Sequence, residues 1–171
     1  MSRCALLGSS GWKVLPGGPR CVNDDLVSKV TLTTELPISA ETACALARKP
    51  QFLKYVLWPI LRATDMSFPD QIDVGAQGSA RLWWFGIIPA WTHHLTVKQL
   101  DATEIYTNEH GGPVCTWNHR LTFTPLDDQR CRYTDEVETD DGWRGFATRM
   151  LIRAVFRYRH HRWHSLTRVL A

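Results

Sequence analysis

The sequence has few cysteines, and their spacing does not suit metal or disulfide chemistry. Its 171 residues include only Cys4, Cys21, Cys44, Cys115 and Cys131, which form no CxxC pair and are odd in number. Zinc ribbons need closely spaced thiolate pairs, and small disulfide frameworks need an even number of cysteines. The sequence supports neither class, and we expect a reducing, cytoplasmic location.

Long apolar runs are also absent. The apolar stretch nearest the N-terminus is "ALL" before "GSSG", which is too short for the core of a secretory signal. No run of about 18 apolar residues is present to cross a bilayer. We therefore expect a soluble protein.

Neither sign of charge is in large excess. Twenty Lys and Arg against seventeen Asp and Glu leave a net charge of +3, which does not by itself indicate a nucleic-acid partner. By contrast, the apolar content of 44%, with eight Trp and six Phe, is ample for the core of one domain. Intrinsic disorder of the whole chain is excluded.

The chain divides into a leader and one domain. Residues 1–28 are rich in Gly, Ser and Pro and lack periodicity, so we interpret them as a flexible leader before a single domain at 29–171. Strict alternation from Lys29 predicts a half-buried strand. A short helix capped by Ser39 should follow, and then a second short helical turn near 51–55.

The rest of the domain reads as strands and one long helix. Residues 142–169 contain no Pro and no Gly after Gly145, which predicts a single helix. Short connections between the strands predict antiparallel neighbours, so the fold class is α+β, a curved sheet packed on a long helix. Six further strands are expected, near 58–67, 79–88, 91–100, 103–110, 114–125 and 129–139.

Two of these strands place polar residues on an apolar face. His119 shares the parity of Trp117 and Leu121, and Asp135 shares that of Tyr133. If cross-strand partners sum to 254, His119 lies opposite Asp135; if they sum to 256, the two are diagonal neighbours. Because an isolated buried carboxylate is costly, we predict an inward His119–Asp135 pair.

Three interpretations of this pair stay open. The residues could be satisfied core groups, or they could form the polar end of an otherwise apolar ligand cavity. In the third interpretation they are a catalytic dyad, although the sequence offers no accompanying nucleophile.

The segment around His119 resembles a known motif. "IYTNEHGGPVCTWNH" is similar to the F-x-D-x-Q-x-x-G-P-F-x-x-W-x-H run of the SRPBCC group, the START-like and polyketide-cyclase-like helix-grip proteins. Thr107 and Glu109 stand where that group has Asp and Gln. Downstream, "FTPLDDQRCRYTDEVE" resembles the F-x-P and T-D-x-V hairpin of the group, and "VFRYRHHRW" its F-x-x-R segment.

The resemblance implies a helix-grip fold: a seven-stranded antiparallel sheet around a long C-terminal helix, with two short helices after the first strand. It also implies a cavity for a hydrophobic small molecule such as a lipid, polyketide or aromatic compound. We expect a non-enzymatic binder; the alternative is a polyketide cyclase or aromatase that uses His119 as general base and Asp135 to orient it. The expected lining is Trp84, Trp91, His93, Leu95, Trp117, His119, Leu121, Phe123, Tyr133, Asp135, Leu151, Val155 and Tyr158.

Neither a metal nor a cofactor is expected. His93 and His94 are adjacent on a predicted strand, so their imidazoles point to opposite faces and do not suit one ion. The "VGAQG" loop lacks the spacing of a phosphate-binding loop.

The long helix has an apolar and a basic side on a 100° wheel. The apolar stripe is expected to close the cavity and comprises Ala147, Leu151, Ala154, Val155, Tyr158 and Val169. The opposite row comprises Arg149, Arg153, Arg157, His160, His164 and Arg168. This row could be an ordinary solvated face, or it could meet an anionic membrane surface or an acidic protein. Nucleic acid is not an expected partner.

Overall fold

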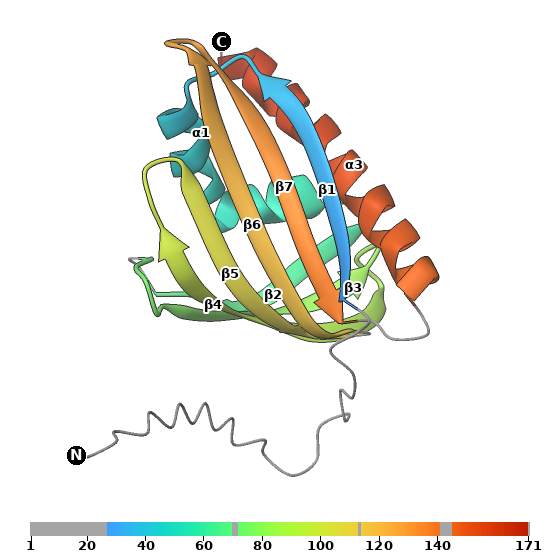
Figure 1. Ribbon diagram of the computed structural model, residues 1–171. Helices are drawn as coiled ribbons and strands as arrows, with labels where there is room; N and C mark the ends of the chain where they lie inside the picture. The colour runs from blue at the N-terminus through green and yellow to red at the C-terminus, as the bar shows by residue number, and fades with distance from the viewer. Residues whose placement is uncertain (1–26, 70–71, 113, 141–144, 171) are drawn as a thin grey trace, which may run out of the picture.

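One seven-stranded antiparallel sheet organises the protein. The computed structural model describes residues 27–69, 72–112, 114–140 and 145–170 (Figure 1). The strands are β1 Val27–Leu36, β2 Leu61–Ser67, β3 Gln77–Trp84, β4 Ile88–Leu100, β5 Glu104–Gly111, β6 Val114–Asp127 and β7 Arg130–Asp140. The helices are α1 Ala40–Ala47, α2 Pro50–Leu57 and α3 Gly145–Leu170. The expected fold is confirmed.

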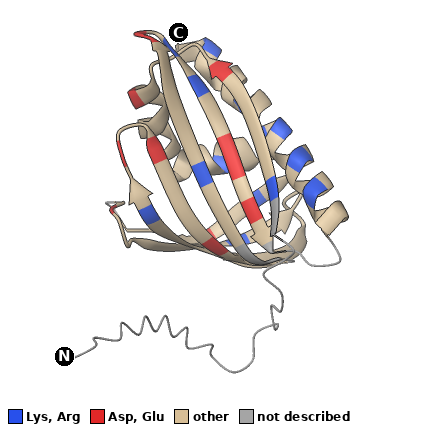
Figure 2. Cartoon of the chain, viewed as in Figure 1, with Lys and Arg blue, Asp and Glu red and all other residues tan. Residues whose placement is uncertain are grey.

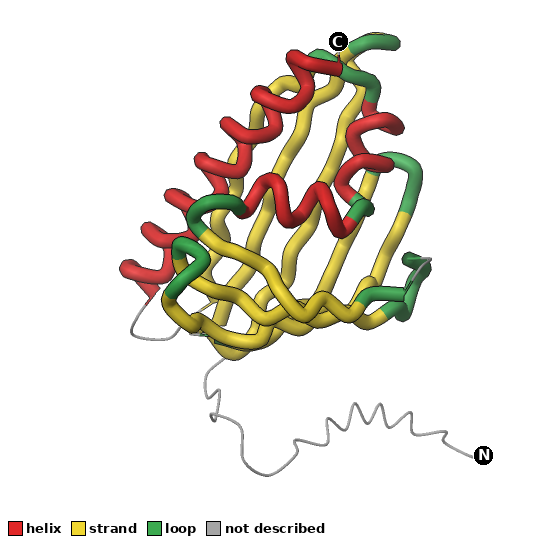
Figure 3. The backbone as a smooth tube through the Cα atoms, turned by 180° about the vertical axis from the view of Figure 1, so that it is seen from behind, coloured by secondary structure: helices red, strands yellow, loops and turns green. Residues whose placement is uncertain are grey.

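Chain order and sheet order differ at one strand. The sheet runs β1-β7-β6-β5-β4-β3-β2, so β2 to β7 form a meander and β1 joins it beside β7. The helices α1 and α2 lead the chain from the β1 edge to the β2 edge, and Figure 3 shows them on the same side of the sheet as α3. Ser39 caps α1 as predicted, since its side chain accepts a hydrogen bond from the backbone N–H of Thr42 at 3.2 Å.

The first strand begins slightly earlier than expected. It starts at Val27, and its burial alternates as predicted, with Val30 buried and Lys29 and Thr31 exposed. The remainder of the expected leader, residues 1–26, lies outside the described residues.

The turn between β3 and β4 was predicted wrongly. We expected it between the strands near 79–88 and 91–100, in the segment "IPA" at 88–90, but the chain reverses at Phe85 and Gly86, and Pro89 lies within β4. Both turn residues have positive φ, 52° and 75°, a conformation that costs glycine little. Gly86 therefore decides the position of this turn.

The buried face of α3 differs from the predicted stripe. Ala147, Ala154 and Val169 are exposed, so the prediction was wrong for these residues. The face that packs on the sheet lies about one residue further along the wheel, because burying two large rings removes more apolar area from water than burying alanines. It comprises Thr148, Ile152, Phe156, Arg159, His160, Trp163 and Thr167.

Candidate functional site

A cavity of about 200 Å³ lies between the sheet and the N-terminal half of α3. Most of its wall is apolar, and the helix contributes Ile152 and Phe156. Nine of the expected lining residues border it: Trp84, Trp91, His93, Leu95, Trp117, His119, Leu121, Leu151 and Val155. The inward orientation of Trp84 follows the predicted parity, and its ring packs edge-on against Trp91 at 5.6 Å between centroids.

Four expected lining residues lie elsewhere. Phe123 and Tyr133 stack on each other at 5.1 Å between ring centroids, in the packed core beyond the cavity. Asp135 lies behind His119 and is 1% exposed. Tyr158 donates a hydrogen bond from its hydroxyl to the backbone oxygen of Trp58 at 2.9 Å, at the surface.

His119 and Asp135 form the predicted inward pair. The β6–β7 register places His119 opposite Val137, a sum of 256, so Asp135 is its diagonal neighbour. His119 Nε2 donates to Asp135 Oδ1, and His119 Nδ1 lies 3.3 Å from Glu109 Oε1 on β5. The imidazole therefore lies between two carboxylates, with both nitrogens occupied.

The network extends from His119 across the sheet to β4. Glu109 Oε2 lies 2.7 Å from Nε2 of His93, and Glu109 Oε1 accepts a hydrogen bond from the Thr107 hydroxyl at 2.6 Å. The indole N–H of Trp91 points at His93 Nδ1, 3.4 Å away. Thr107 and Glu109 stand where the SRPBCC motif has Asp and Gln, and they are hydrogen-bonded to each other.

On its other side the network reaches α3. The Tyr133 hydroxyl donates to Asp135 Oδ2 at 2.6 Å, and the same oxygen faces Arg159 Nε at 3.7 Å and His160 Nε2 at 3.6 Å. These two distances are too long for hydrogen bonds, so the contacts from the helix are electrostatic. The charge of Asp135, which is costly to bury, is compensated from three directions.

The surroundings shift the pKa values of the network strongly. Burial alone would lower the pKa of His119, but the charge of Asp135 and the hydrogen bonds to both carboxylates outweigh it and raise the pKa to about 9. Burial opposes the charged form of Asp135 too, yet Arg159 and His119 hold its pKa well below the ordinary value. The pKa of Glu109 is likewise held low against burial by His119 and His93. At neutral pH His119 is therefore a cation between two anions.

Two side chains of the site were not predicted from the sequence. Glu109 lines the cavity and joins two histidines, and its inward parity with Ile105 and Thr107 could have indicated this. Arg159 lines the cavity and is 7% exposed. With Phe156 it forms the F-x-x-R segment of the resemblance, and that spacing of three puts both residues on one helical face.

The basic row on α3 is only partly a surface feature. Arg153, Arg157 and Arg168 are exposed, which agrees with the expectation. Figure 2 shows several Lys or Arg positions along α3. His160 is buried against Asp135, and His164 Nε2 lies 2.7 Å from the hydroxyl of Thr34 on β1. These two histidines were wrongly grouped with the solvated arginines, because His160 belongs to the face that packs on the sheet and His164 borders that face.

The described residues hold no group of three or more His, Cys, Asp or Glu side chains arranged to hold a metal ion. His93 points inward, while His94 stacks on His110 at 4.9 Å between ring centroids on the other face of the sheet. Within the same part of the chain, no helix combines the length and the apolar character needed to cross a membrane.

The chain was compared with protein families and with curated proteins. A family model described as "Domain of unknown function (DUF8410)" matches residues 34–167. No curated protein matches the chain.

Solved structures share the fold at low sequence identity. A START superfamily protein from Mycobacterium smegmatis is 15% identical, with a TM-score of 0.67 over 84% of this chain and 99% of that chain. A Chromobacterium violaceum protein is 12% identical, with a TM-score of 0.69 over 81% and 96% of the two chains. A conserved protein from Geobacillus kaustophilus is 12% identical, with a TM-score of 0.61 over 82% and 95%. These structural matches show that the chain has a START-like fold. At this level of sequence identity they show nothing about its ligand or activity.

Proposed function

The chain belongs to the family described as a domain of unknown function (DUF8410), and we propose that it binds a small hydrophobic molecule between the sheet and α3. The observation that carries the proposal is the hollow of about 200 Å³ lined by Trp84, Trp91 and Trp117. An apolar cavity of about 150 Å³ already accepts benzene. The cavity is therefore large enough for one substituted ring.

Energetics support an occupant. Protein interiors are normally close-packed, so a mostly apolar hollow between a sheet and a helix is a feature that suits a ligand. A hydrophobic ligand that covers its apolar walls would remove that surface from water, which is worth roughly 25 cal/mol per Å².

The polar end of the ligand would meet Arg159. His119 has no free nitrogen, because both of its ring nitrogens face carboxylates. Arg159 borders the cavity, and its buried Nε has no hydrogen-bond partner within the described residues, although it is paired by charge with Asp135 at 3.7 Å. Guanidinium groups only donate. The ligand we propose thus carries an acceptor oxygen on an apolar body.

The cyclase or aromatase alternative is not favoured by any observation. A general base must be unprotonated near the operating pH and within reach of the substrate. His119 has a pKa raised to about 9, and its protons are directed to Glu109 and Asp135. Its role in this proposal is to fix the network that positions Arg159.

Calorimetric titration with two probes of one shape tests the proposal. Acetophenone and isopropylbenzene share a ring and a branched substituent, but only acetophenone has a carbonyl oxygen. We expect both to bind the wild-type protein, and native mass spectrometry should detect a small molecule in the freshly purified protein. If neither probe binds and no molecule co-purifies, the proposal is wrong.

Three variants separate the cavity from its polar end. Ala80→Phe fills the cavity from β3 and should abolish binding of both probes, whereas Ala102→Phe, at an exposed position in the β4–β5 turn, should change neither. Arg159→Met should weaken acetophenone binding about tenfold and leave isopropylbenzene binding unchanged. Equal losses for both probes would mean that Arg159 only packs.

A further inference from the structure

Large apolar side chains gather on the surface beside the cavity. At the β3–β4 turn, Phe85, Ile87 and Ile88 are 61%, 76% and 53% exposed, and the neighbouring Trp58 is 48% exposed. On the first turns of α3, Phe146 and Met150 are 72% and 50% exposed. Single exposed apolar residues are ordinary, but a contiguous group marks an interaction surface. We call these six residues the apolar rim.

Contacts hold the first part of the apolar rim together. The backbone N–H of Phe85 donates to the oxygen of Ile60, and a side chain at Gly86 would meet the Trp58 ring at 3.1 Å. The turn before β2 and the β3–β4 turn therefore form one continuous surface.

The helix completes the apolar rim. The hydroxyl of Tyr158 bonds to the backbone oxygen of Trp58, which fixes α3 against this surface. Figures 1 and 3, seen from opposite sides, both place the β3–β4 turn beside the N-terminal half of α3. Phe146 and Met150 are followed by Arg153 and Arg157 at spacings of four, three and four, so apolar and basic side chains share one exposed helical stripe.

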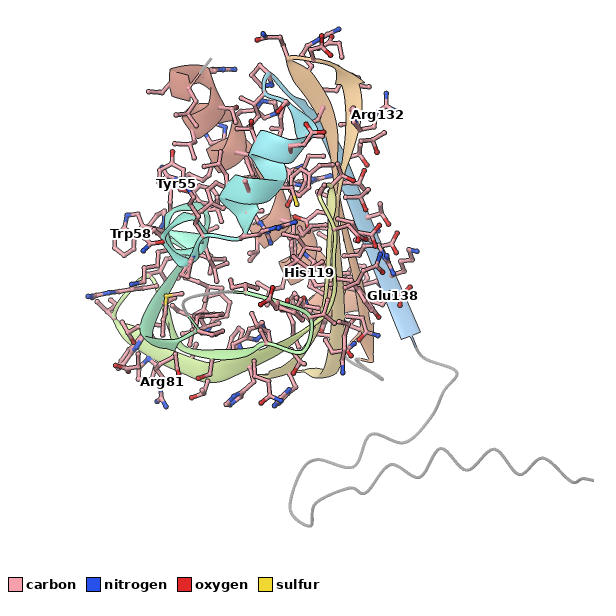
Figure 4. All side chains as sticks on the ribbon, turned by 90° about the vertical axis from the view of Figure 1, so that its left-hand side faces the viewer. Tyr55, Trp58, Arg81, His119, Arg132 and Glu138 are labelled. Carbon is pink, nitrogen blue, oxygen red and sulfur yellow. The ribbon has the colours of Figure 1, made fainter. Side chains whose placement is uncertain are left out.

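The segments that carry the apolar rim contain no acidic residue. No Asp or Glu occurs in the three segments 49–64, 77–100 and 145–170. Each of these segments has exposed Lys or Arg side chains. Glu136 and Glu138 lie on β7, and Figure 4 shows Glu138 and Trp58 on opposite sides of the domain. These three segments are thus basic, and among the described residues the exposed Asp65 directly follows the first of them.

The apolar rim borders the cavity. Leu57, Trp84 and Leu151 line the cavity, and their chain neighbours Trp58, Phe85 and Met150 belong to the rim. A ligand that enters or leaves on this side passes the exposed apolar residues.

We infer that the apolar rim and the arginines beside it dock on an anionic membrane surface. A tight turn that presents Phe and Ile next to Trp matches side chains that insert at the boundary between headgroups and acyl chains. Arg153 and Arg157 lie next to these residues, where anionic headgroups attract basic side chains. Docking in this orientation directs the cavity toward the hydrocarbon layer, in which a hydrophobic ligand is most concentrated.

Vesicle sedimentation tests this inference with the full chain. Phosphatidylcholine vesicles with and without phosphatidylglycerol are compared at low and high salt. We expect sedimentation with the anionic vesicles, weakened by salt. The double variant Arg153→Glu/Arg157→Glu should lower the apparent affinity about thirtyfold or more, since each lost cation near the surface contributes to binding.

A matched pair of aspartate substitutions isolates the apolar part. Ile87→Asp at the tip of the turn should lower vesicle affinity about tenfold or more, because it removes an inserting side chain. Val169→Asp, at an 82% exposed position near the other end of α3, should leave affinity unchanged. Circular dichroism should show all variants folded.

Three outcomes would overturn the inference. Wild-type protein could fail to sediment with anionic vesicles, or Ile87→Asp and Val169→Asp could lose affinity equally. Alternatively, size-exclusion chromatography without vesicles could show a dimer that Ile87→Asp dissociates, in which case the apolar rim is a protein interface.

Discussion

The space between the sheet and α3 has a packed half and a hollow half. In the packed half, Trp163 meets Phe52, Tyr133 and Phe123 at 4.2, 5.3 and 5.9 Å between ring centroids. None of these four side chains borders the cavity. In the hollow half, the rings of Trp84 and Trp91 line the cavity of about 200 Å³.

The buried polar network lies between these halves. Tyr133 joins Asp135 from the packed side, while Glu109 and Arg159 border the cavity on the other. Because each charge in the network has a partner, none of these residues can move inward without losing one. The network therefore marks the boundary between the aromatic core and the cavity.

The largest effect is expected in the packed half. Trp163→Ala removes a fully buried ring from three aromatic neighbours and should lower the free energy of unfolding by about 4 kcal/mol. Urea denaturation monitored by circular dichroism measures this loss. A cost below about 2 kcal/mol would show that this half is packed loosely as well.

The boundary between the halves should be almost as sensitive. Asp135→Asn keeps the shape but removes the anion that faces Arg159 and one of the two that face His119, and breaking such a buried pair typically costs about 3 kcal/mol. The same denaturation experiment applies. Unchanged stability would mean that the charges are compensated by solvent.

The raised pKa of His119 predicts an alkaline loss of stability. The group gains its proton more readily in the folded state, so its contribution is complete below about pH 6.5 and is lost as the pH rises through about 9. A loss on the order of 2–3 kcal/mol is expected between these limits. Stability should be followed across this range by urea denaturation.

The buried thiols need a control in that experiment. Burial also raises the pKa values of Cys44 and Cys131, the latter to about 11, which adds to alkaline instability. The measurement therefore belongs in a Cys44→Ala/Cys131→Ala background. Imidazole NMR signals should show His119 doubly protonated until about pH 9, and titration near pH 6.5 would contradict the network.

The smallest effect is expected in the hollow half. Trp84→Ala removes a half-buried ring that already faces empty space, so little additional cavity cost arises. We expect a loss of about 1–2 kcal/mol, well below that of Trp163→Ala. A similar cost for both substitutions, measured by urea denaturation, would remove the distinction between the two halves.

Strand parity explains why so much of the fold was predictable. The side chain of a strand residue points to one of only two faces. The alternation around His119 and Asp135 predicted that both point inward, and it limited the pairing register of their strands to two choices. The observed sum of 256 is one of them. Short connections then left few topologies for the sheet.

Helix orientation was harder because rotation about a helix axis is continuous. The stripe with Ala147 and Ala154 looked apolar, yet the rings of Phe156 and Trp163 determine which side is buried. In the sequence, Arg159 looks like the exposed arginines of the same helix. It differs from them because it faces the buried Asp135, which the sequence alone does not reveal. Glu109 was missed for the same reason, since its partners His93 and His119 come from two other strands.

The position of β1 beside β7 has a consequence for synthesis. The ribosome releases residues 27–36 first among the strands, but their hydrogen-bonding partners at 131–140 emerge about a hundred residues later. Until then the earliest strand has no neighbour, and the pairing that completes the sheet depends on contacts distant in sequence, which form slowly. A nascent chain that stalls before residue 131 thus exposes an unpaired edge to whatever strand it meets.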